Sequence, residues 1–180
     1  MEMLHQIEST ALLGIQNNIR TPLLTSFFSF ITHLGDAGAI WIALCLVLLV
    51  FRSTRYEGVR ASLSLLVTFL INNLLLKNIF DRTRPFYMID SLSVLIEYPS
   101  DASFPSGHSA AAFAVASALI FAGAPKRISI PAAVLAVLVA FSRLYFGVHY
   151  PSDVICGAAT GTLCAAATVF ALRRIKAGKD

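Results

Sequence analysis

Charged residues are scarce in this chain. Asp, Glu, Lys and Arg make up only 13% of its 180 residues, whereas hydrophobic residues make up 57%. An ordinary soluble domain carries roughly 25% charged residues. A chain of this length leaves room for a single domain, residues 1–180, and cannot bury so much apolar surface within itself. The composition therefore predicts an all-α integral membrane protein, with the bilayer as the solvent of its helices.

Cysteine is also scarce, and the three cysteines form no recognisable pattern. Cys45, Cys156 and Cys164 lie inside apolar stretches, and no two of them have the spacing of a zinc site or a disulfide framework. We interpret them as small buried hydrophobic residues. A cleavable signal peptide is not predicted, because residues 1–20 lack a basic start followed by an apolar core. The net charge of +4 is modest and its basic residues stand at the ends of apolar runs, so nucleic acid is not a predicted partner.

Uncharged stretches predict the membrane spans. The first, Thr21–Gly35, is short, and we expect it to form a tilted span that ends in a turn at Gly35-Asp36-Ala37-Gly38. Five further stretches follow: Ala37–Phe51, Ala61–Leu76, Ala102–Pro125, Ile128–Ser142 and Val154–Leu172. Several are shorter than the ~20 residues that a span needs, but flanking residues can lengthen them. We therefore predict about six transmembrane helices over residues 21–173.

Two segments fall outside the predicted spans. Residues 1–20 carry apolar side chains at helical spacing, which predicts a short amphipathic helix lying on the membrane surface. Its apolar residues are Leu4, Ile7, Ala11, Leu12 and Ile15. The other segment, residues 81–103, is the only long connection, and long loops in compact domains are usually functional.

The distribution of basic residues predicts the orientation of the bundle. Loops rich in Lys and Arg stay in the cytoplasm. The basic residues that fall on one side by alternation are Arg52, Arg55, Arg60, Lys126, Arg127, Arg173, Arg174, Lys176 and Lys179. That side is predicted to be cytoplasmic, and the 81–103 loop extracytoplasmic. With six spans, both ends of the chain would be cytoplasmic.

The opposite face is expected to collect the residues that carry chemistry. Three patterns stand at the outward ends of predicted spans: Lys77 followed by Arg84-Pro85; Pro105-Ser106-Gly107-His108; and Ser142-Arg143 followed by His149 and Asp153. Alternating topology would bring all three to one membrane surface. Cations gathered around one anion are suited to phosphoryl transfer, in which charge stabilisation dominates.

Each pattern alone also has a plain structural interpretation. Lys77 and Arg143 could snorkel to the interface. Ser106 could simply cap a helix, although the free backbone N–H groups at a helix start also attract anions. His149 and Asp153 could be an interfacial histidine beside a helix-start carboxylate. Asp81 and Arg82 are interpreted as polar loop residues, and Trp41 and Tyr150 as interface anchors.

Taken together, the three patterns resemble the signature of the type 2 phosphatidic acid phosphatase family. The resemblance implies that His149 is a nucleophile forming a phosphohistidine, that Asp153 orients it, and that His108 protonates the leaving group and then activates water. It implies further that the family's metal-independent chemistry holds here, with no cofactor. The phosphate ligands that it implies are Lys77, Arg84, Ser106, Gly107 and Arg143.

By this resemblance, we expect a bacterial inner-membrane enzyme that removes phosphate from a lipid on the extracytoplasmic face. Undecaprenyl diphosphate is favoured by analogy within the family, and phosphatidylglycerophosphate and phosphatidate are the alternatives. A lipid phosphotransferase, or a non-catalytic protein that binds or translocates lipids, is the alternative of another class. The partners are then the lipid substrate and the bilayer, and the sequence indicates no oligomeric state.

Overall fold

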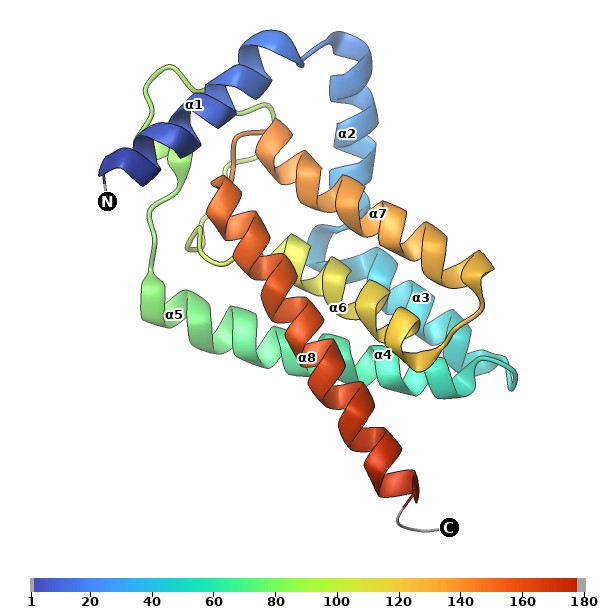
Figure 1. Ribbon diagram of the computed structural model, residues 1–180. Coiled ribbons are helices and arrows are strands. Elements are labelled where there is room, and N and C mark those ends of the chain that lie inside the picture. The colour runs from blue at the N-terminus through green and yellow to red at the C-terminus, as the bar shows by residue number, and fades with distance from the viewer. Residues whose placement is uncertain (1, 178–180) are drawn as a thin grey trace.

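The computed structural model describes residues 2–177, and within this range the chain folds into helices with no strand (Figure 1). The predicted all-α class is therefore confirmed. The elements are α1 (Glu2–Asn18), α2 (Pro22–Leu34), η1 (Asp36–Gly38), α3 (Ala39–Val50), α4 (Arg55–Thr68), η2 (Phe69–Leu76), α5 (Lys77–Phe80), η3 (Pro85–Tyr87), α6 (Gly107–Ala122), α7 (Lys126–Tyr145) and α8 (Pro151–Ala177).

Three helical segments within residues 2–177 are long and apolar enough to cross a membrane. They are Arg55–Tyr87, Lys126–Tyr145 and Pro151–Ile175. Helices α2 and α3 meet the same test only as a pair, bent by 48° at the break between them. Helix α6 is apolar but has only 16 residues. The prediction of about six spans is thus not confirmed, although the membrane character of the bundle is.

The difference lies at Gly35-Asp36-Ala37-Gly38, which the sequence analysis interpreted as a turn between two spans. Ala37 and Gly38 have φ of 50° and 72°, left-handed values that interrupt helical hydrogen bonding. The chain bends there but does not reverse. Phe28 of α2 packs on Tyr145 at the end of α7, and Trp41 of α3 lies beside Ile128 near the start of α7. Together, α2 and α3 therefore form one bent helical unit that passes the length test for a span only as a pair.

Helix α1 and the end of α8 lie at opposite ends of the bundle. Glu8 of α1 bonds to Ser152 at the start of α8, whereas Arg173 near the end of α8 bonds to the carbonyl of Phe121 at the end of α6. Figure 1 shows this separation of α1 from the end of α8. Within residues 2–177, this arrangement differs from the expectation, made for six spans, that both chain ends share one side.

Helix α1 is helical as predicted, but its docked face is partly polar. Glu8 and Leu12 are buried against α7 and α8, while Met3, Leu4 and Ile7 are exposed. The sequence analysis assigned Leu4, Ile7 and Leu12 to one apolar face, whereas the structure exposes the first two and buries the third. The exposed apolar side chains are compatible with a position on the membrane surface, which stays a prediction.

Helix α6 lies at the centre of the bundle, in contact with α4, α7 and α8 (Figure 1). Many of its inward side chains are small, and those at Ala110, Ala112, Ala114 and Ala118 are fully buried. Gly157 and Gly161 of α8 complete the close approach. A β-carbon on Gly161 would lie 2.8 Å from the backbone nitrogen of Ala114, and closer still to the carbonyl oxygen of Ala110. Small residues let two helix backbones meet in this way.

The span that begins with α4 contains a π-helical segment, η2, in which Asn72 is fully buried. Its side-chain nitrogen donates to the carbonyl oxygen of Pro105 at 3.4 Å, just before α6. The bond joins two helical segments across the bundle, a common role for an asparagine inside a membrane protein. The contact holds the start of α6 beside the helix that carries Lys77.

Candidate active site

A cavity of about 1120 Å³ opens at the end of the bundle where α5, α6 and the α7–α8 connection meet. Six of the eight predicted site residues line it, and they come from all three sequence patterns: Lys77, Arg84, Gly107, His108, Arg143 and His149. Ser106 and Asp153 are fully buried behind its wall. The juxtaposition expected from alternating topology therefore exists, despite the different number of passes.

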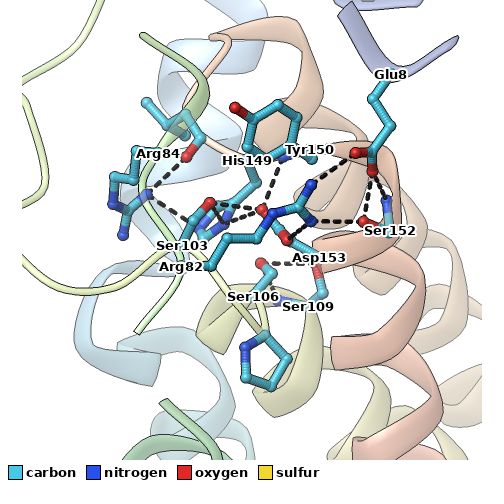
Figure 2. Close-up of polar contacts among 12 residues, drawn as sticks. Glu8, Arg82, Arg84, Ser103, Ser106, Ser109, His149, Tyr150, Ser152 and Asp153 are labelled. Carbon is cyan, nitrogen blue, oxygen red and sulfur yellow. Dashed lines mark hydrogen bonds and ion pairs between the residues drawn. The ribbon is translucent and has the colours of Figure 1, made fainter. Parts of the chain in front are cut away.

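His149 occupies the connection between α7 and α8 and presents its two ring nitrogens to different surroundings (Figure 2). Nε2 faces Nη1 of Arg84 at 3.4 Å, at the cavity wall. Nδ1 faces Oδ2 of Asp153 at 3.6 Å and Oγ of Ser103 at 3.5 Å. Burial lowers the pKa of His149 from 6.5 to about 3, opposed by Asp153 and assisted by the charges of Arg84 and Arg143. The ring is therefore neutral at physiological pH and has a lone pair available.

Asp153, in the first turn of α8, is held on every side. Its Oδ2 accepts hydrogen bonds from Oγ of Ser103 at 2.5 Å and from the backbone nitrogen of Tyr150 at 2.9 Å. Its Oδ1 accepts from Nη1 of Arg82 at 2.6 Å (Figure 2). A fully buried carboxylate needs such donors to remain charged. The arrangement can hold the neighbouring imidazole in one orientation.

Lys77 and Arg84 converge on one carboxylate, Asp101, from the 81–103 loop. Arg84 donates from Nη2 to Oδ1 of Asp101 at 2.6 Å, and Lys77 pairs with Oδ2. Burial alone would raise the pKa of Asp101, but these two cations lower it from 3.8 to about 2. Arg84 also donates to the carbonyl of Val148 at 2.7 Å, which ties the cation to the residue before His149. The carboxylate of Asp101 thus occupies the position where the two basic side chains meet.

Arg143 is the third cation of the cavity wall, and its side chain is only partly satisfied. It is 3% exposed, and its Nη1 donates to Oγ1 of Thr32 at 2.5 Å. Its Nε is buried without a hydrogen-bond partner, and no ion pair to Arg143 occurs within residues 2–177. A buried guanidinium without a carboxylate is costly unless an anionic ligand binds to it. The position fits a phosphate ligand better than a snorkelling side chain.

Of the three predicted site residues at the start of α6, two line the cavity and one does not. His108 lines the cavity, and its Nε2 lies 3.0 Å from Oδ1 of Asp36 in η1. Gly107 also lines the cavity, close against the side chain of Asn73. Ser106 instead turns away from the cavity and caps α6, accepting from the backbone nitrogen of Ser109 at 3.4 Å. Its predicted role as a phosphate ligand stays a prediction.

The sequence analysis missed several polar residues of the site region, namely Glu8, Thr32, Asp36, Arg82, Asp101 and Ser103. Arg82 was interpreted as a polar loop residue, but it bridges Asp153 and Glu8 through two 2.6 Å ion pairs. Its position two residues before Arg84 was the only available signal, since a contact between residues 74 positions apart leaves no local pattern. Trp41 and Tyr150 are 0% and 2% exposed, so their interpretation as interface anchors was wrong.

Comparison with known proteins gives one consistent result. The family model described as the PAP2 superfamily matches residues 57–176. An undecaprenyl-diphosphatase of Sulfolobus acidocaldarius is 35% identical over 118 residues, which is 66% of this chain and 56% of that protein. Phosphatidylglycerophosphatase B of Bacillus subtilis is 34% identical over 159 residues, covering 81% of this chain and 73% of that protein.

A solved structure agrees with the sequence matches. The crystal structure of a transmembrane PAP2 type phosphatidylglycerolphosphate phosphatase from Bacillus subtilis superposes with a TM-score of 0.73 and 30% identity. The superposition covers 97% of this chain and 86% of that one. The family model alone matches well over half of the sequence and includes all three sequence patterns. The chain therefore belongs to the PAP2 superfamily.

Proposed function

We propose that the protein is a metal-independent lipid phosphatase that works through a phosphohistidine on His149. One observation carries the proposal. A buried, neutral histidine presents Nε2 to a cavity whose wall also contains Lys77, Arg84 and Arg143. Three cations beside one nucleophile are suited to stabilising the charge of a phosphoryl group in transfer.

In the first step, Nε2 of His149 attacks the phosphorus, and the bond from phosphorus to the leaving oxygen breaks. His108, across the cavity, gives a proton to that oxygen, so the lipid alcohol or lipid phosphate departs in protonated form. Asp36, 3.0 Å from Nε2 of His108, supports the protonated imidazole that this step requires. The negative charge of Asp153 stabilises the positive charge that develops on the imidazole ring of His149.

In the second step, His108 takes a proton from water, and the resulting hydroxide attacks the phosphohistidine. The nitrogen–phosphorus bond breaks, inorganic phosphate is released and His149 returns to its neutral form. Lys77, Arg84 and Arg143 hold the phosphate oxygens in both steps. No step in this scheme requires a metal ion.

The shape of the cavity supports a lipid as substrate. Beyond its charged end, its wall continues along α3 and α4 with apolar side chains, among them Ile42, Leu46, Leu65, Leu66 and Phe69. A water-soluble phosphate ester would leave this part of the wall in contact with water. A phosphate attached to a hydrocarbon chain matches both ends of the cavity.

Undecaprenyl diphosphate is the substrate we favour, because a curated relative is named an undecaprenyl-diphosphatase. Phosphatidylglycerophosphate is the second candidate, supported by another relative and by the solved structure. Phosphatidate is a further alternative within the same chemistry. The charged end of the cavity is compatible with all three headgroups.

We propose further that the protein is a multi-pass protein of the bacterial inner membrane, with five antiparallel passes formed by α2–α3, α4–α5, α6, α7 and α8. Arg55 and Arg60 in α4, Lys126 and Arg127 in α7, and Arg173 in α8 lie toward the ends opposite the cavity. The positive-inside rule assigns that end to the cytoplasm. The cavity, the 81–103 loop and α1 are then extracytoplasmic.

The test is phosphate release by purified protein in detergent with excess chelator. Undecaprenyl diphosphate, phosphatidylglycerophosphate, phosphatidate and p-nitrophenyl phosphate are compared, with His149→Ala as the control. We expect release from one lipid well above the others, inhibition by vanadate as a transition-state mimic, and a loss of roughly 10³-fold or more in His149→Ala.

The other outcomes identify the alternatives. Normal activity of His149→Ala would exclude the phosphohistidine, and loss of activity with chelator restored by magnesium would exclude the metal-free scheme. A ³²P-labelled phosphohistidine that discharges to a lipid acceptor instead of water would indicate a phosphotransferase. Lipid binding without any turnover would indicate the non-catalytic protein.

A further inference from the structure

Arg82 lies between the matched positions Lys77 and Arg84 without being one of them, and yet it contacts the residue behind the proposed nucleophile. It follows α5 in the chain and does not line the cavity. Its Nη1 donates to Oδ1 of Asp153 at 2.6 Å and to Oγ of Ser152 at 2.7 Å. Its guanidinium carbon lies 4.0 Å from the centre of the Tyr150 ring, so the aromatic ring also supports one face of the guanidinium group (Figure 2).

The same guanidinium reaches a residue of the N-terminal helix. Nη2 of Arg82 donates to Oε2 of Glu8 at 2.6 Å. Glu8 is 2% exposed, and its Oε1 accepts from the backbone nitrogen of Ser152 at 3.1 Å. Figure 2 shows Glu8, Arg82 and Asp153 in one connected set of bonds. Helix α1 thus contributes a buried carboxylate to the support of α8.

The charges of this set account for its composition. Asp153 and Glu8 are both buried acids, and a buried carboxylate without a counter-charge is strongly unfavourable. Arg82 is the basic residue that lies between them, since the ion pairs found within residues 2–177 link it to both. Two acids and one guanidinium leave one net negative charge, which can stabilise a cationic phosphohistidine beside Asp153.

The two oxygens of Asp153 have different partners. Oδ2 faces His149 and accepts from Ser103 and from the backbone of Tyr150. Within residues 2–177, Oδ1 accepts a hydrogen bond from Arg82 alone. Without Arg82, Oδ1 would be left unpaired, and rotation of the carboxylate would carry Oδ2 away from Nδ1 of His149.

We propose that Arg82 is a positioning residue for the nucleophile, acting through Asp153, and that Glu8 of α1 acts in turn through Arg82. The proposal rests on the proposed function, because it assigns these residues to the support of a reacting His149. Neither residue touches the phosphate. Their removal should therefore affect turnover more than substrate binding.

The experiment compares Arg82→Gln, Arg82→Lys, Glu8→Gln and the Glu8→Gln/Arg82→Gln double variant with the wild type. Gln16→Ala is the matched control: Gln16 also fastens α1, through the carbonyl of Ser91 at 2.9 Å, but does not contact the Arg82 set. For each protein, kcat and KM are measured with the preferred lipid, and thermal unfolding is followed in the same detergent. Nitrogen-15 spectra of the histidines report the tautomer of His149 independently of activity.

We expect Arg82→Gln to lower kcat at least tenfold with KM changed less than threefold. Arg82→Lys should recover several-fold of this loss, because an ammonium can still pair with Asp153. Glu8→Gln should lower kcat about threefold in the wild type and cause no further loss in Arg82→Gln, as expected for residues that act in series. Gln16→Ala should keep the wild-type kcat, even if its unfolding temperature falls.

The proposal is overturned if Arg82→Gln retains kcat within twofold of the wild type or changes KM alone. It is also overturned if Gln16→Ala loses as much activity as Glu8→Gln, because α1 docking in general would then be responsible. If Arg82→Gln does not fold, Arg82→Lys and Glu8→Gln decide by the same criteria. An inactive wild type would refute the proposed function, while an Arg82-dependent tautomer of His149 would still support the positioning role.

Discussion

Oγ of Ser103 donates a 2.5 Å hydrogen bond to Oδ2 of Asp153, the carboxylate oxygen that faces Nδ1 of His149 at 3.6 Å. Ser103 is fully buried, although it belongs to the long loop between α5 and α6. Its backbone nitrogen also donates to the carbonyl of Arg82 at 2.8 Å. The loop therefore does more than border the cavity, because its last residues reach behind the proposed nucleophile.

Ser103→Ala should lower kcat by about three- to tenfold and leave KM nearly unchanged. The substitution removes one of the donors to a buried carboxylate, and one such hydrogen bond contributes roughly 0.5–1.5 kcal/mol. The measurement is steady-state hydrolysis of the preferred lipid. Ser93→Ala, in the exposed part of the same loop, is the control. Equal effects of the two substitutions would contradict a specific role for Ser103.

His149 should remain neutral far below the pH at which an ordinary histidine is protonated. Burial, with Arg84 and Arg143, lowers its pKa from 6.5 to about 3. The unfolded chain binds this proton at higher pH than the folded one, so the free energy of unfolding should fall as the pH is lowered from about 6.5 toward 3. Nitrogen-15 titration follows the ring directly, with His149→Asn to assign its signals. Half-protonation of His149 near pH 6.5 would show that its ring is more accessible to solvent than the structure indicates.

Asp101→Asn should increase the affinity for phosphate ligands several-fold, visible as a lower KM and a lower inhibition constant for vanadate. The Asp101 carboxylate pairs with Lys77 and Arg84, and since its pKa is lowered to about 2 it stays ionised at every working pH. A phosphate must therefore compete with it for the same two cations. Glu97→Gln is the control, because Glu97 lines the same cavity and forms no ion pair within residues 2–177. A higher KM in Asp101→Asn would mean that Asp101 instead preorganises the cations for substrate.

Much of the candidate site could be predicted because its residues form short patterns in the sequence. Lys77 with Arg84, Gly107 with His108, and Arg143 with His149 each lie within a few residues, at the ends of apolar runs. Alternation of the helices was then enough to bring them to one end of the bundle. Six of the eight predicted residues line one cavity although six passes are not confirmed, because all three patterns begin after the bent α2–α3 segment.

The missed residues are those whose partners are remote in sequence. Glu8 was interpreted as part of a surface helix, and nothing near it indicates that it pairs with Arg82. The bend at Ala37 and Gly38 was interpreted as a reversal, because a turn and a kink use the same residues. Trp41 was predicted at the interface but packs in the core with Cys45 and Leu48. Each error concerns tertiary packing, which a linear pattern does not encode.

Gly161→Ala should destabilise the protein by about 1–3 kcal/mol or prevent its assembly, as expected for overpacking of a close contact. The new methyl group would meet the backbone of Ala110 and Ala114 in α6, which cannot move aside as a flexible side chain can. Thermal unfolding in detergent is the measurement. Gly14→Ala in α1 is the control, because a β-carbon there has open space and should be neutral or slightly stabilising. Unchanged stability of Gly161→Ala would mean that α6 and α8 can separate without cost.

The glycine contact between α6 and α8 has a consequence for how such an enzyme can change. His108 stands at the first turn of α6 and His149 just before α8, so the contact between the two helix backbones sets the separation of the proposed acid from the proposed nucleophile. The walls that we propose to contact the lipid come from other parts of the chain: α2–α3, α4 and the 81–103 loop. Reaction and recognition therefore occupy separate structural modules. Substitutions along the lipid-facing wall can alter which headgroup or tail is accepted while the two histidines keep their spacing, which gives the fold a route to new substrates without loss of its chemistry.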